Sequence, residues 1–329
     1  MTHPAFNGIL GQERVLNVLS DAMANGRIAS AYLFEGPSGV GKELTAMRLA
    51  SQAVAGGHPD IEYRIANSNH PDVRVFRPRE EGNRNIQVEY LREEILPVAQ
   101  YAPFEASRSF LIFPEADVSF PQKHPEAANA ILKPLEEPRP GVTFILIAER
   151  PDRLLPTIRS RCQRLRFSRL PNSVVDSILE ATGAPAQARS ITTHLAQGSA
   201  DKALALAQDG LAEELFRTAK EIDQAVDARR PGDIVNLADD LAKSDRYASL
   251  LQTLHAYYRD VAAAGLGVAE SSWGFRHEAD HLRERAARLP PARAAARAEL
   301  LQATLRILES NANPTLCMDQ LLFRLRDAR

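Results

Sequence analysis

A glycine-rich loop near the N-terminus carries the strongest structural information in this sequence. The loop consists of Gly36, Pro37, Ser38, Gly39, Val40, Gly41 and Lys42. An apolar run over 31–34 precedes it and a helix-favouring segment over 44–55 follows it, which is the context of a phosphate-binding P-loop. Glycines let backbone N–H groups wrap a phosphate, the helix N-terminus adds partial positive charge, and Lys42 adds a full one. The next residue, where Ser or Thr would coordinate magnesium, is Glu43. The sequence therefore predicts a nucleotide-binding fold with an altered metal site.

Charge and cysteine content narrow the classes of protein that fit this sequence. A net charge of -2 over 329 residues excludes a protein that binds nucleic acid through bulk positive charge, and the length suits two or three domains. The two cysteines, Cys162 and Cys317, lie far apart and favour a reducing compartment without a disulfide framework. The N-terminus lacks a signal-peptide pattern and no apolar run reaches about 18 residues, so we expect a soluble, cytoplasmic protein without a membrane partner.

Strand-like and helix-like patterns alternate in the first half of the chain. Residues 72–76, 109–113 and 143–148 have the alternating or continuously apolar character of strands, and residues 88–98 and 127–135 have helical spacing. Strands separated by helices favour an α/β fold in which a parallel sheet is covered on both faces.

The strand signals end near residue 171. From residue 174 to 329 the sequence predicts helices only. Their breaks fall at Gly183, Gly198, Gly210, Pro231, residues 265–267 and residues 290–291. Within this half, the arginine-rich run 285–297 is typical of a solvated helix face, with a basic DNA-binding helix as the alternative.

Four segments of the sequence form a recognisable set. They are residues 9–12 (Ile-Leu-Gly-Gln), 31–37, 129–138 with its Leu-Glu-Glu-Pro box, and 158–162 with its Ser-Arg-Cys motif. Together they resemble the AAA+ clamp-loader family of bacterial DNA polymerase III, which opens the ring-shaped sliding clamp and places it on primed DNA. The resemblance covers residues 5 to about 210 and resumes at 311–322. It implies an AAA+ P-loop domain over 1–170, a small helical lid domain over 171–208 and an all-α collar domain over 209–329 that joins partner subunits.

Two positions of the P-loop domain depart from the metal-binding pattern of this family. Glu43 stands in place of the hydroxyl residue, although a carboxylate is itself a metal ligand. The strand over 110–113 should be followed by Asp-Glu-Ala-Asp, but the metal-organising Asp is Pro114, which has no side-chain oxygen. Glu115 is retained, and it aligns with the carboxylate that activates water in this family. A catalytic role for Glu115 and a solvated carboxylate without such a role are equal alternatives.

Two further positions, which sense the nucleotide in active members of this family, also depart from the family pattern. Glu149 or Arg150 stands where active members of the family carry a polar residue such as Thr or Asn. Asp201 stands where they place a sensor arginine, and Lys202 would point about a quarter-turn away on a helix. These departures predict a subunit that does not hydrolyse ATP and that binds ATP weakly or not at all.

Arg161, in the Ser-Arg-Cys motif, matches the family's arginine finger. The resemblance implies that it reaches across a subunit interface and stabilises charge developing on the γ-phosphate of the neighbour's nucleotide. Cys162 is expected to be a small buried packing residue rather than a reactive thiol. Arg164 and Arg166 alternate along 163–167 and are expected to share one exposed strand face.

The segment in which many family members carry a four-cysteine zinc module has no cysteine here. It contains His58 and His70, which are typical of ordinary surface residues when no thiolate accompanies them. We predict no zinc in this segment.

Three functions from different classes fit these observations. The favoured one is a structural clamp-loader subunit, a component of the polymerase holoenzyme, that gives Arg161 in trans to an ATPase neighbour. The second is a working clamp-loader ATPase in which Glu43 and Glu115 hold the metal. The third, an unrelated P-loop enzyme acting on a small molecule, is disfavoured by the Ser-Arg-Cys motif and the long helical half. The expected partners of the first are other clamp-loader subunits, the sliding clamp and, only within the assembled complex, primed DNA.

Overall fold

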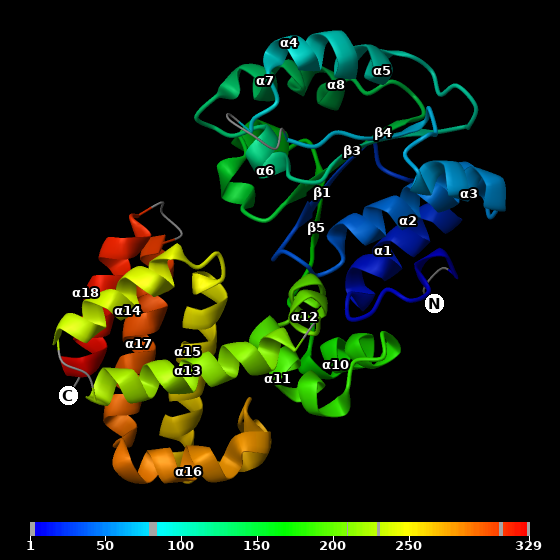
Figure 1. The fold of residues 1–329 in the computed structure, drawn as a ribbon. Coiled ribbons are helices and arrows are strands. Elements are labelled where there is room, and N and C mark those ends of the chain that lie inside the picture. The colour runs from blue at the N-terminus through cyan, green and yellow to red at the C-terminus, as the bar shows by residue number, and fades with distance from the viewer. Residues whose placement is uncertain (1–3, 79–83, 209, 229–230, 309–311, 328–329) are drawn as a thin grey trace. The chain divides into compact units, whose positions relative to one another are not determined.

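The computed structural model describes residues 4–78, 84–208, 210–228, 231–308 and 312–327 (Figure 1). The chain divides into two compact units, Met1–Pro171 and Asn172–Arg329. The predicted change from alternating strands and helices to helices alone coincides with this division.

The first unit is built on a five-stranded sheet with the order β2-β3-β4-β1-β5. Its strands are β1 (Ala31–Glu35), β2 (Val73–Val75), β3 (Ser109–Phe113), β4 (Val142–Ala148) and β5 (Gln163–Arg166). Every pairing in the sheet is parallel. The three central strands are buried along their whole length, as expected for strands covered on both faces. The predicted α/β fold with a parallel sheet is confirmed.

Helices cover both faces of this sheet (Figure 1). One face carries α1 (Glu13–Ala24), α2 (Lys42–Ala55) and α3 (Pro59–Ala66). The other face carries α4 (Val88–Tyr90), the π-helical turn Leu91–Ile95, α5 (Leu96–Gln100), α7 (Pro125–Ala130) and α8 (Leu132–Glu136). Short helices α6 (Ala116–Ser119) and α9 (Pro156–Arg159) complete the unit, with 3-10 turns at Pro4–Phe6 and Pro151–Arg153.

The alternation of side chains along β1 explains how one strand supports both layers. Tyr32 and Phe34 belong to the hydrophobic cluster beneath α1 and α2, whereas Leu33 belongs to the cluster that includes residues of α7, α8 and α9. The helix predicted over 127–135 is divided into α7 and α8. Pro134 lies within this stretch and has no N–H to donate, which weakens a continuous helix there.

The second unit contains helices and connecting turns, and none of its described residues lies in a strand. Its helices are α10 (Asn172–Ala181), α11 (Ala186–Ala196), α12 (Ala200–Leu206), α13 (Leu211–Ala228), α14 (Pro231–Lys243), α15 (Tyr247–Gly265), α16 (Ala279–Arg288), α17 (Pro291–Leu308) and α18 (Pro314–Asp327), with short 3-10 turns at Glu270–Ser272 and Arg276–Glu278. The predicted glycine and proline breaks fall between these helices or at their first or last residues. Ile191 and Leu195 of α11 and Leu206 of α12 share one hydrophobic core with the helices that follow, and the boundary between lid and collar stays a prediction.

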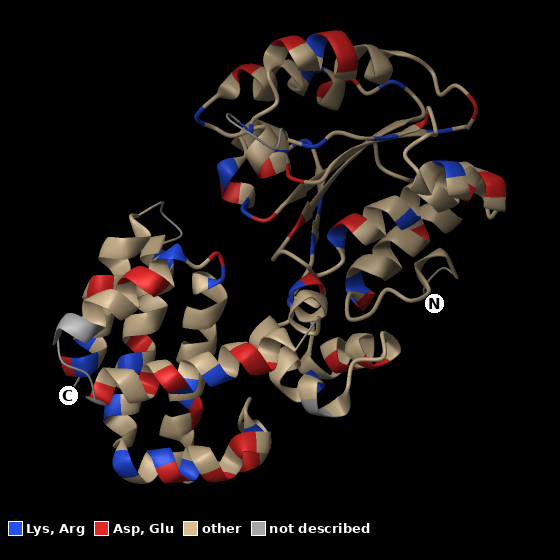
Figure 2. Cartoon of the chain, viewed as in Figure 1, with Lys and Arg blue, Asp and Glu red and all other residues tan. Residues whose placement is uncertain are grey.

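Charged residues of both signs are distributed over the helices of each unit (Figure 2). The predicted solvated helix face over 285–297 is wrong for its two ends. The run is divided between α16 and α17, and Arg297 is fully buried. The side chain of Arg285 is only 14% exposed, so neither arginine presents a free charge to solvent.

Two aspartates of α13 explain why these arginines are buried. Asp223 accepts hydrogen bonds from Arg285 Nε at 2.6 Å, Arg297 Nη1 at 3.2 Å and the Tyr258 hydroxyl at 2.8 Å. Asp227 accepts from the terminal amino groups of both arginines, at 2.5 and 2.6 Å. Buried charges are tolerated only when they are paired in this way. Arg285 and Arg297 therefore hold helices of the second unit together and are not available to contact DNA.

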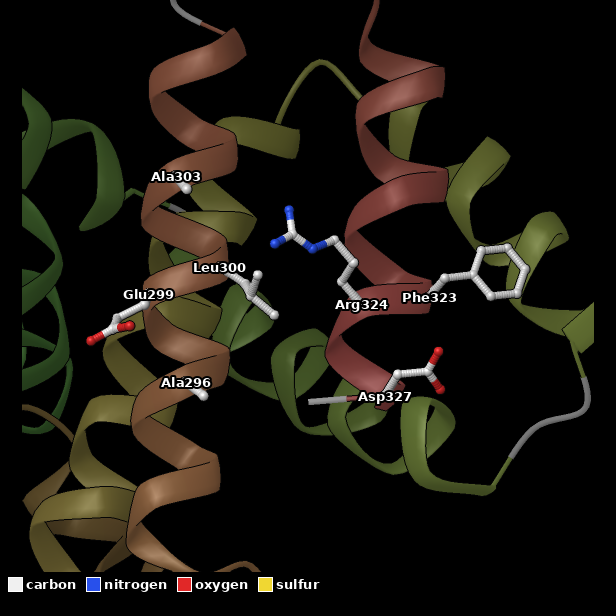
Figure 3. A pocket seen from close by; sticks show the side chains of 7 residues that line it. All are labelled: Ala296, Glu299, Leu300, Ala303, Phe323, Arg324 and Asp327. Atoms are coloured by element: carbon white, nitrogen blue, oxygen red, sulfur yellow. The ribbon is translucent and has the colours of Figure 1, made fainter. Parts of the chain in front are cut away.

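A surface groove lies between α17 and α18 (Figure 3). Its volume is about 550 Å³. Its lining residues are Ala296, Glu299, Leu300, Ala303, Phe323, Arg324 and Asp327. Leu300 and Arg324 point into the space between the two helices. The lining of the groove combines apolar side chains with charged side chains of both signs.

No helix in the part of the chain that the structure describes is long and apolar enough to cross a lipid bilayer.

Candidate functional site

The predicted P-loop connects β1 to α2, as the sequence indicates. Gly39 and Gly41 have φ values of 70° and 89°, a conformation that L-residues with a side chain rarely adopt. A Cβ atom on Gly36 would lie 2.2 Å from the carbonyl oxygen of Phe167, so the residue after β5 leaves room only for glycine. These glycines give the loop the shape that lets backbone N–H groups face a phosphate.

Lys42 lies at the first position of α2 and is mostly buried, with 8% exposure. Its Nζ donates to the carbonyl oxygen of Gly36 at 2.7 Å and also to that of Pro37. The ammonium group therefore folds back over the loop and places a positive charge against its backbone carbonyls.

Gln12 ties this loop to the end of the sheet. Its Nε2 donates to the carbonyl oxygens of Ser168 at 2.8 Å and Val40 at 3.3 Å, and its Oε1 accepts from the Ser168 N–H at 3.2 Å. Gln12 is 4% exposed. The sequence placed this residue in a family motif without a role, and the structure gives it one, because its amide fixes the P-loop against the residues after β5.

Glu43 is engaged by a residue that sequence reasoning missed. Arg77, which follows β2, forms an ion pair from Nη2 to one carboxylate oxygen of Glu43 and donates from Nη1 to the other at 3.3 Å. Arg84, further along the same connection, pairs with Glu115 at 2.9 Å. Both carboxylates that the sequence offered to a metal thus have arginine partners. Pairing across 34 and 31 residues has no periodic signal in the sequence.

Asp117, the last residue of the Pro-Glu-Ala-Asp segment after β3, has a structural role. Its carboxylate is 6% exposed and accepts from the N–H of Arg150 at 2.9 Å and that of Glu149 at 3.4 Å. These two N–H groups belong to the turn after β4, where the sequence placed a sensor residue. The carboxylate shapes that turn, whereas the side chain of Glu149 is exposed.

The position of the second sensor lies at the start of α12. Asp201 is exposed in the first turn of that helix, where a negative charge suits the helix dipole. Ser199 caps the helix by accepting from the Lys202 N–H at 3.3 Å. The Nζ of Lys202 donates to Gln252 of α15, within the same unit.

The two histidines of the cysteine-free segment differ from one another. His58 is exposed and precedes α3. His70 is only 3% exposed, and its Nδ1 accepts from the Asp72 N–H at 3.1 Å, so the prediction of a surface residue is wrong there. Asp72 in turn accepts three backbone N–H groups of residues 104–106, at 2.7 to 2.9 Å. Across the described residues, no group of three or more His, Cys, Asp and Glu side chains is arranged to hold a metal ion.

Arg161 lies between α9 and β5 with its side chain 32% exposed. Its Nη2 forms an ion pair with Glu136, the last residue of α8, and its Nη1 donates to the Thr157 carbonyl at 2.9 Å. The neighbouring Cys162 is buried, as predicted, and burial raises the pKa of its thiol to about 12. A thiol with so high a pKa stays protonated and unreactive at neutral pH.

The topology of the sheet separates Arg161 from the chain's own P-loop. β5 pairs in parallel with β1, and its first residue, Gln163, lies opposite Tyr32 near the start of β1. The P-loop follows the carboxyl end of β1, about 10 Å further along the sheet. Arg161 precedes β5 and therefore lies near the amino-terminal ends of the parallel strands, whereas the P-loop lies at their carboxyl ends. Glu136, which precedes β4, lies near the same amino-terminal ends.

Arg164 and Arg166 share a face of β5, and both contact Glu35 on β1. Arg164 binds both carboxylate oxygens at 2.8 to 3.1 Å, and Arg166 Nε binds one at 2.7 Å. The Glu35 side chain is 6% exposed, whereas those of Arg164 and Arg166 are 39% and 78% exposed. The predicted exposed face is correct, but its arginines also neutralise a nearly buried carboxylate that sequence reasoning did not single out.

Comparison with known proteins relates this chain to subunits of DNA polymerase III. Residues 11–171 match the family described as "DNA polymerase III, delta subunit". The chain is 36% identical to the DNA polymerase III subunit delta' of Bacillus subtilis over 186 residues, which cover 54% of each chain. It is 37% identical to the Pseudomonas aeruginosa subunit delta' over 142 residues, 41% of this chain and 42% of that one. This chain resembles the delta-prime subunit of DNA polymerase III.

The extent of the resemblance differs between relatives. The chain spans about half the length of the delta-prime relatives it matches. It is 29% identical to the DNA polymerase III subunit gamma/tau of Mycobacterium tuberculosis over 98% of this chain and 61% of that one. Among solved structures, a gamma-subunit-related protein of Thermotoga maritima covers 94% of this chain and 99% of its own, with a TM-score of 0.50 and 18% identity. This likeness shows a shared fold alone.

Proposed function

We propose that this chain is a delta-prime-like subunit of the DNA polymerase III clamp loader. It does not hydrolyse ATP itself, and it gives Arg161 to the nucleotide of a neighbouring ATPase subunit. One observation carries the proposal: Arg161 lies toward the edge of the sheet opposite the chain's own P-loop, with a third of its side chain exposed. An arginine placed there suits a phosphate on another subunit better than one on its own.

The altered metal positions support the absence of hydrolysis. Magnesium requires oxygen ligands in near-octahedral geometry. Pro114 offers no side-chain oxygen, and the Glu43 carboxylate is already paired with Arg77. The loop and Lys42 remain suited to a phosphate, but the residues around them do not suit the metal that would accompany it. ATP binding by the isolated chain is therefore weak or absent.

The chemistry of a guanidinium suits the role assigned to Arg161. In phosphoryl transfer, negative charge spreads over the oxygens of the transferred group, and an arginine supplied by a neighbour raises the rate by about 10³–10⁵ in related systems. A planar guanidinium presents paired N–H donors to two oxygens at once, which an ammonium does not. Arg161 would donate hydrogen bonds to these phosphate oxygens and would stay protonated throughout.

Other clamp-loader subunits, the sliding clamp and primed DNA are the partners that this role requires. DNA contact would occur within the assembled complex, because a chain with net charge -2 makes few phosphate contacts alone. The burial of Arg297 and the pairing of Arg285 with Asp223 and Asp227 leave these two arginines unavailable for such contacts.

A second function is a gamma/tau-like subunit that hydrolyses ATP. Two observations favour it: the alignment with a gamma/tau subunit covers 98% of the chain, and Glu115 is retained. It would require Glu43 and Glu115 to exchange their arginine partners for a metal ion.

ATP turnover separates the two functions. The purified chain is measured alone and in complex with its partner subunits, with and without clamp and primed DNA. We expect no turnover by the chain alone and DNA-stimulated turnover by the complex that depends on Arg161. Magnesium-dependent turnover by the chain alone would support the gamma/tau-like function and overturn the proposal.

A further inference from the structure

The ion pair between Arg161 and Glu136 joins two motifs that lie 25 residues apart in the sequence. Glu136 ends α8 and belongs to the Leu-Glu-Glu-Pro box, and Arg161 belongs to the Ser-Arg-Cys motif after α9. The two side chains are 47% and 32% exposed, so the pair lies at the surface and is open to a neighbouring subunit.

Buried neighbours fix the backbone on both sides of this pair. Leu135, next to Glu136, is 4% exposed, and Ile158 and Cys162, which flank Arg161, are 0% and 9% exposed. All three belong to the same hydrophobic cluster under the sheet. Packing therefore holds the last turn of α8 and the loop after α9 at a set distance, and the ion pair forms between two anchored segments rather than between mobile ones.

The guanidinium of Arg161 is held at both of its terminal amino groups. Nη2 pairs with Glu136, whereas Nη1 donates to the Thr157 carbonyl at 2.9 Å and contacts Ser160 Oγ at 3.4 Å. An arginine side chain is long and flexible, so two separate contacts restrict the directions in which its planar group faces. Five N–H bonds on the group allow it to keep these contacts and still donate to phosphate oxygens.

We propose that Glu136 is a positioning residue for Arg161. Its carboxylate holds the guanidinium in the orientation from which it meets the neighbour's γ-phosphate. This inference rests on the proposed function, because it assigns a second residue to the same arginine finger. Orientation matters because a misplacement of about 1 Å in a catalytic group lowers a rate by up to about 10²-fold.

The main alternative is that Glu136 inhibits the reaction instead of positioning Arg161. A carboxylate beside the finger places negative charge near the neighbour's phosphates, and a purely inhibitory Glu136 would slow the reaction. The two effects predict opposite signs for Glu136→Ala. Positioning predicts a lower rate, whereas inhibition predicts a higher one.

The experiment uses the assembled complex and measures steady-state ATP hydrolysis with clamp and primed DNA present. We expect Glu136→Ala to lower kcat by about 10-fold, with KM and subunit association unchanged, because orientation and not ATP affinity is lost. Glu136→Gln keeps an oxygen that accepts from Nη2 and should give an intermediate kcat. Glu137→Ala is the matched control. It removes the same charge from the adjacent exposed residue and should leave the rate unchanged.

A double substitution tests whether Glu136 acts through Arg161. If it does, Glu136→Ala should lower the rate no further in a complex that already carries Arg161→Ala, since the two residues act as a unit. An unchanged or higher kcat for Glu136→Ala, while Arg161→Ala lowers it, would overturn the positioning role alone. An equal loss from Glu137→Ala would also overturn it. An unchanged rate for Arg161→Ala would overturn the proposed function itself.

Discussion

Glu43, at the position where a P-loop carries its metal-binding hydroxyl, forms a two-point ion pair with Arg77. The guanidinium thus neutralises the carboxylate that the sequence offered as a metal ligand. Arg84 does the same for Glu115. Because both arginines come from the connection that follows β2, the altered P-loop and this connection form one local arrangement of charges.

Replacing the altered metal positions should improve nucleotide binding. The double substitution Glu43→Thr and Pro114→Asp supplies a hydroxyl and a carboxylate to magnesium, and titration calorimetry should detect tighter, magnesium-dependent ATP binding. Turnover should not appear, because Asp201 still lacks the positive charge of a sensor arginine. The unaltered chain is the control. Micromolar, magnesium-dependent ATP affinity in that control would contradict the prediction.

Arg164 should matter more to stability than Arg166. Arg164 binds both oxygens of the nearly buried Glu35 carboxylate, whereas the more exposed Arg166 binds one. Removing a partner from a buried charge is destabilising, but Arg164 is partly exposed and Arg166 remains, so we expect Arg164→Ala to lower the free energy of unfolding by about 1–2 kcal/mol. Arg166→Ala should lower it by less than about 1 kcal/mol. Urea denaturation of the two variants checks the order, and a reversed order would show that Glu35 depends on Arg166.

The buried arginine of α17 should be among the most sensitive positions in the second unit. Arg297→Met removes the donor that links Asp223, Asp227 and the Leu325 carbonyl, and it leaves aspartates short of a partner. We expect a loss of about 3–5 kcal/mol in unfolding free energy. Arg324→Met, at an exposed arginine of α18, is the control and should change stability by less than about 0.5 kcal/mol. Similar denaturation midpoints for the two variants would refute the structural importance of the contacts that Arg297 makes with Asp223 and Asp227.

The two halves of the chain illustrate what periodic patterns reveal and what they miss. Continuous apolar runs predicted the central strands, and glycine and proline breaks predicted the ends of the helices, because both signals are local. The side-chain partners of Glu43 and Glu35 are not local, since each comes from another part of the sheet domain. Sequence spacing carries no information about such pairs until the topology of the sheet is known.

The burial of Arg297 had a signal that charge counting concealed. Ala294, Ala298 and Leu301 are buried on α17 and lie three, one and four residues from Arg297. Helical spacing of three and four places Ala294 and Leu301 on the same face as the arginine. On α13, Asp223 and Asp227 are four residues apart and Asp223 follows the buried Ile222. An arginine and an acidic pair on apolar faces of two helices indicate a buried ion cluster.

Mildly acidic pH should destabilise the second unit through His194. Burial, reinforced by Arg259, lowers the pKa of His194 to about 4, below the ordinary value of 6.5. Because the unfolded chain then binds a proton that the folded chain does not, stability is complete above about pH 6.5 and declines as the pH falls toward 4. We expect a loss of about 1–3 kcal/mol across this range. His194→Gln should flatten the dependence, whereas His58→Gln, at an exposed histidine, should not.

Arg161 gives the most direct prediction for function. Arg161→Ala should leave folding and subunit association intact, because the side chain is partly exposed and its ion pair with Glu136 lies at the surface. It should lower clamp- and DNA-stimulated ATP hydrolysis by the whole complex by about 10³-fold or more, as loss of an arginine finger does. Arg161→Lys should rescue poorly, since an ammonium lacks the forked, planar donors that match phosphate oxygens. Arg153→Ala, at an exposed arginine of the same connection between β4 and β5, controls for the loss of one charge and should leave hydrolysis unchanged. If the Arg161→Ala complex hydrolysed ATP and loaded clamps at the original rate, Arg161 would be only one more surface charge, and the phosphate of the neighbouring subunit would have to be stabilised by another residue.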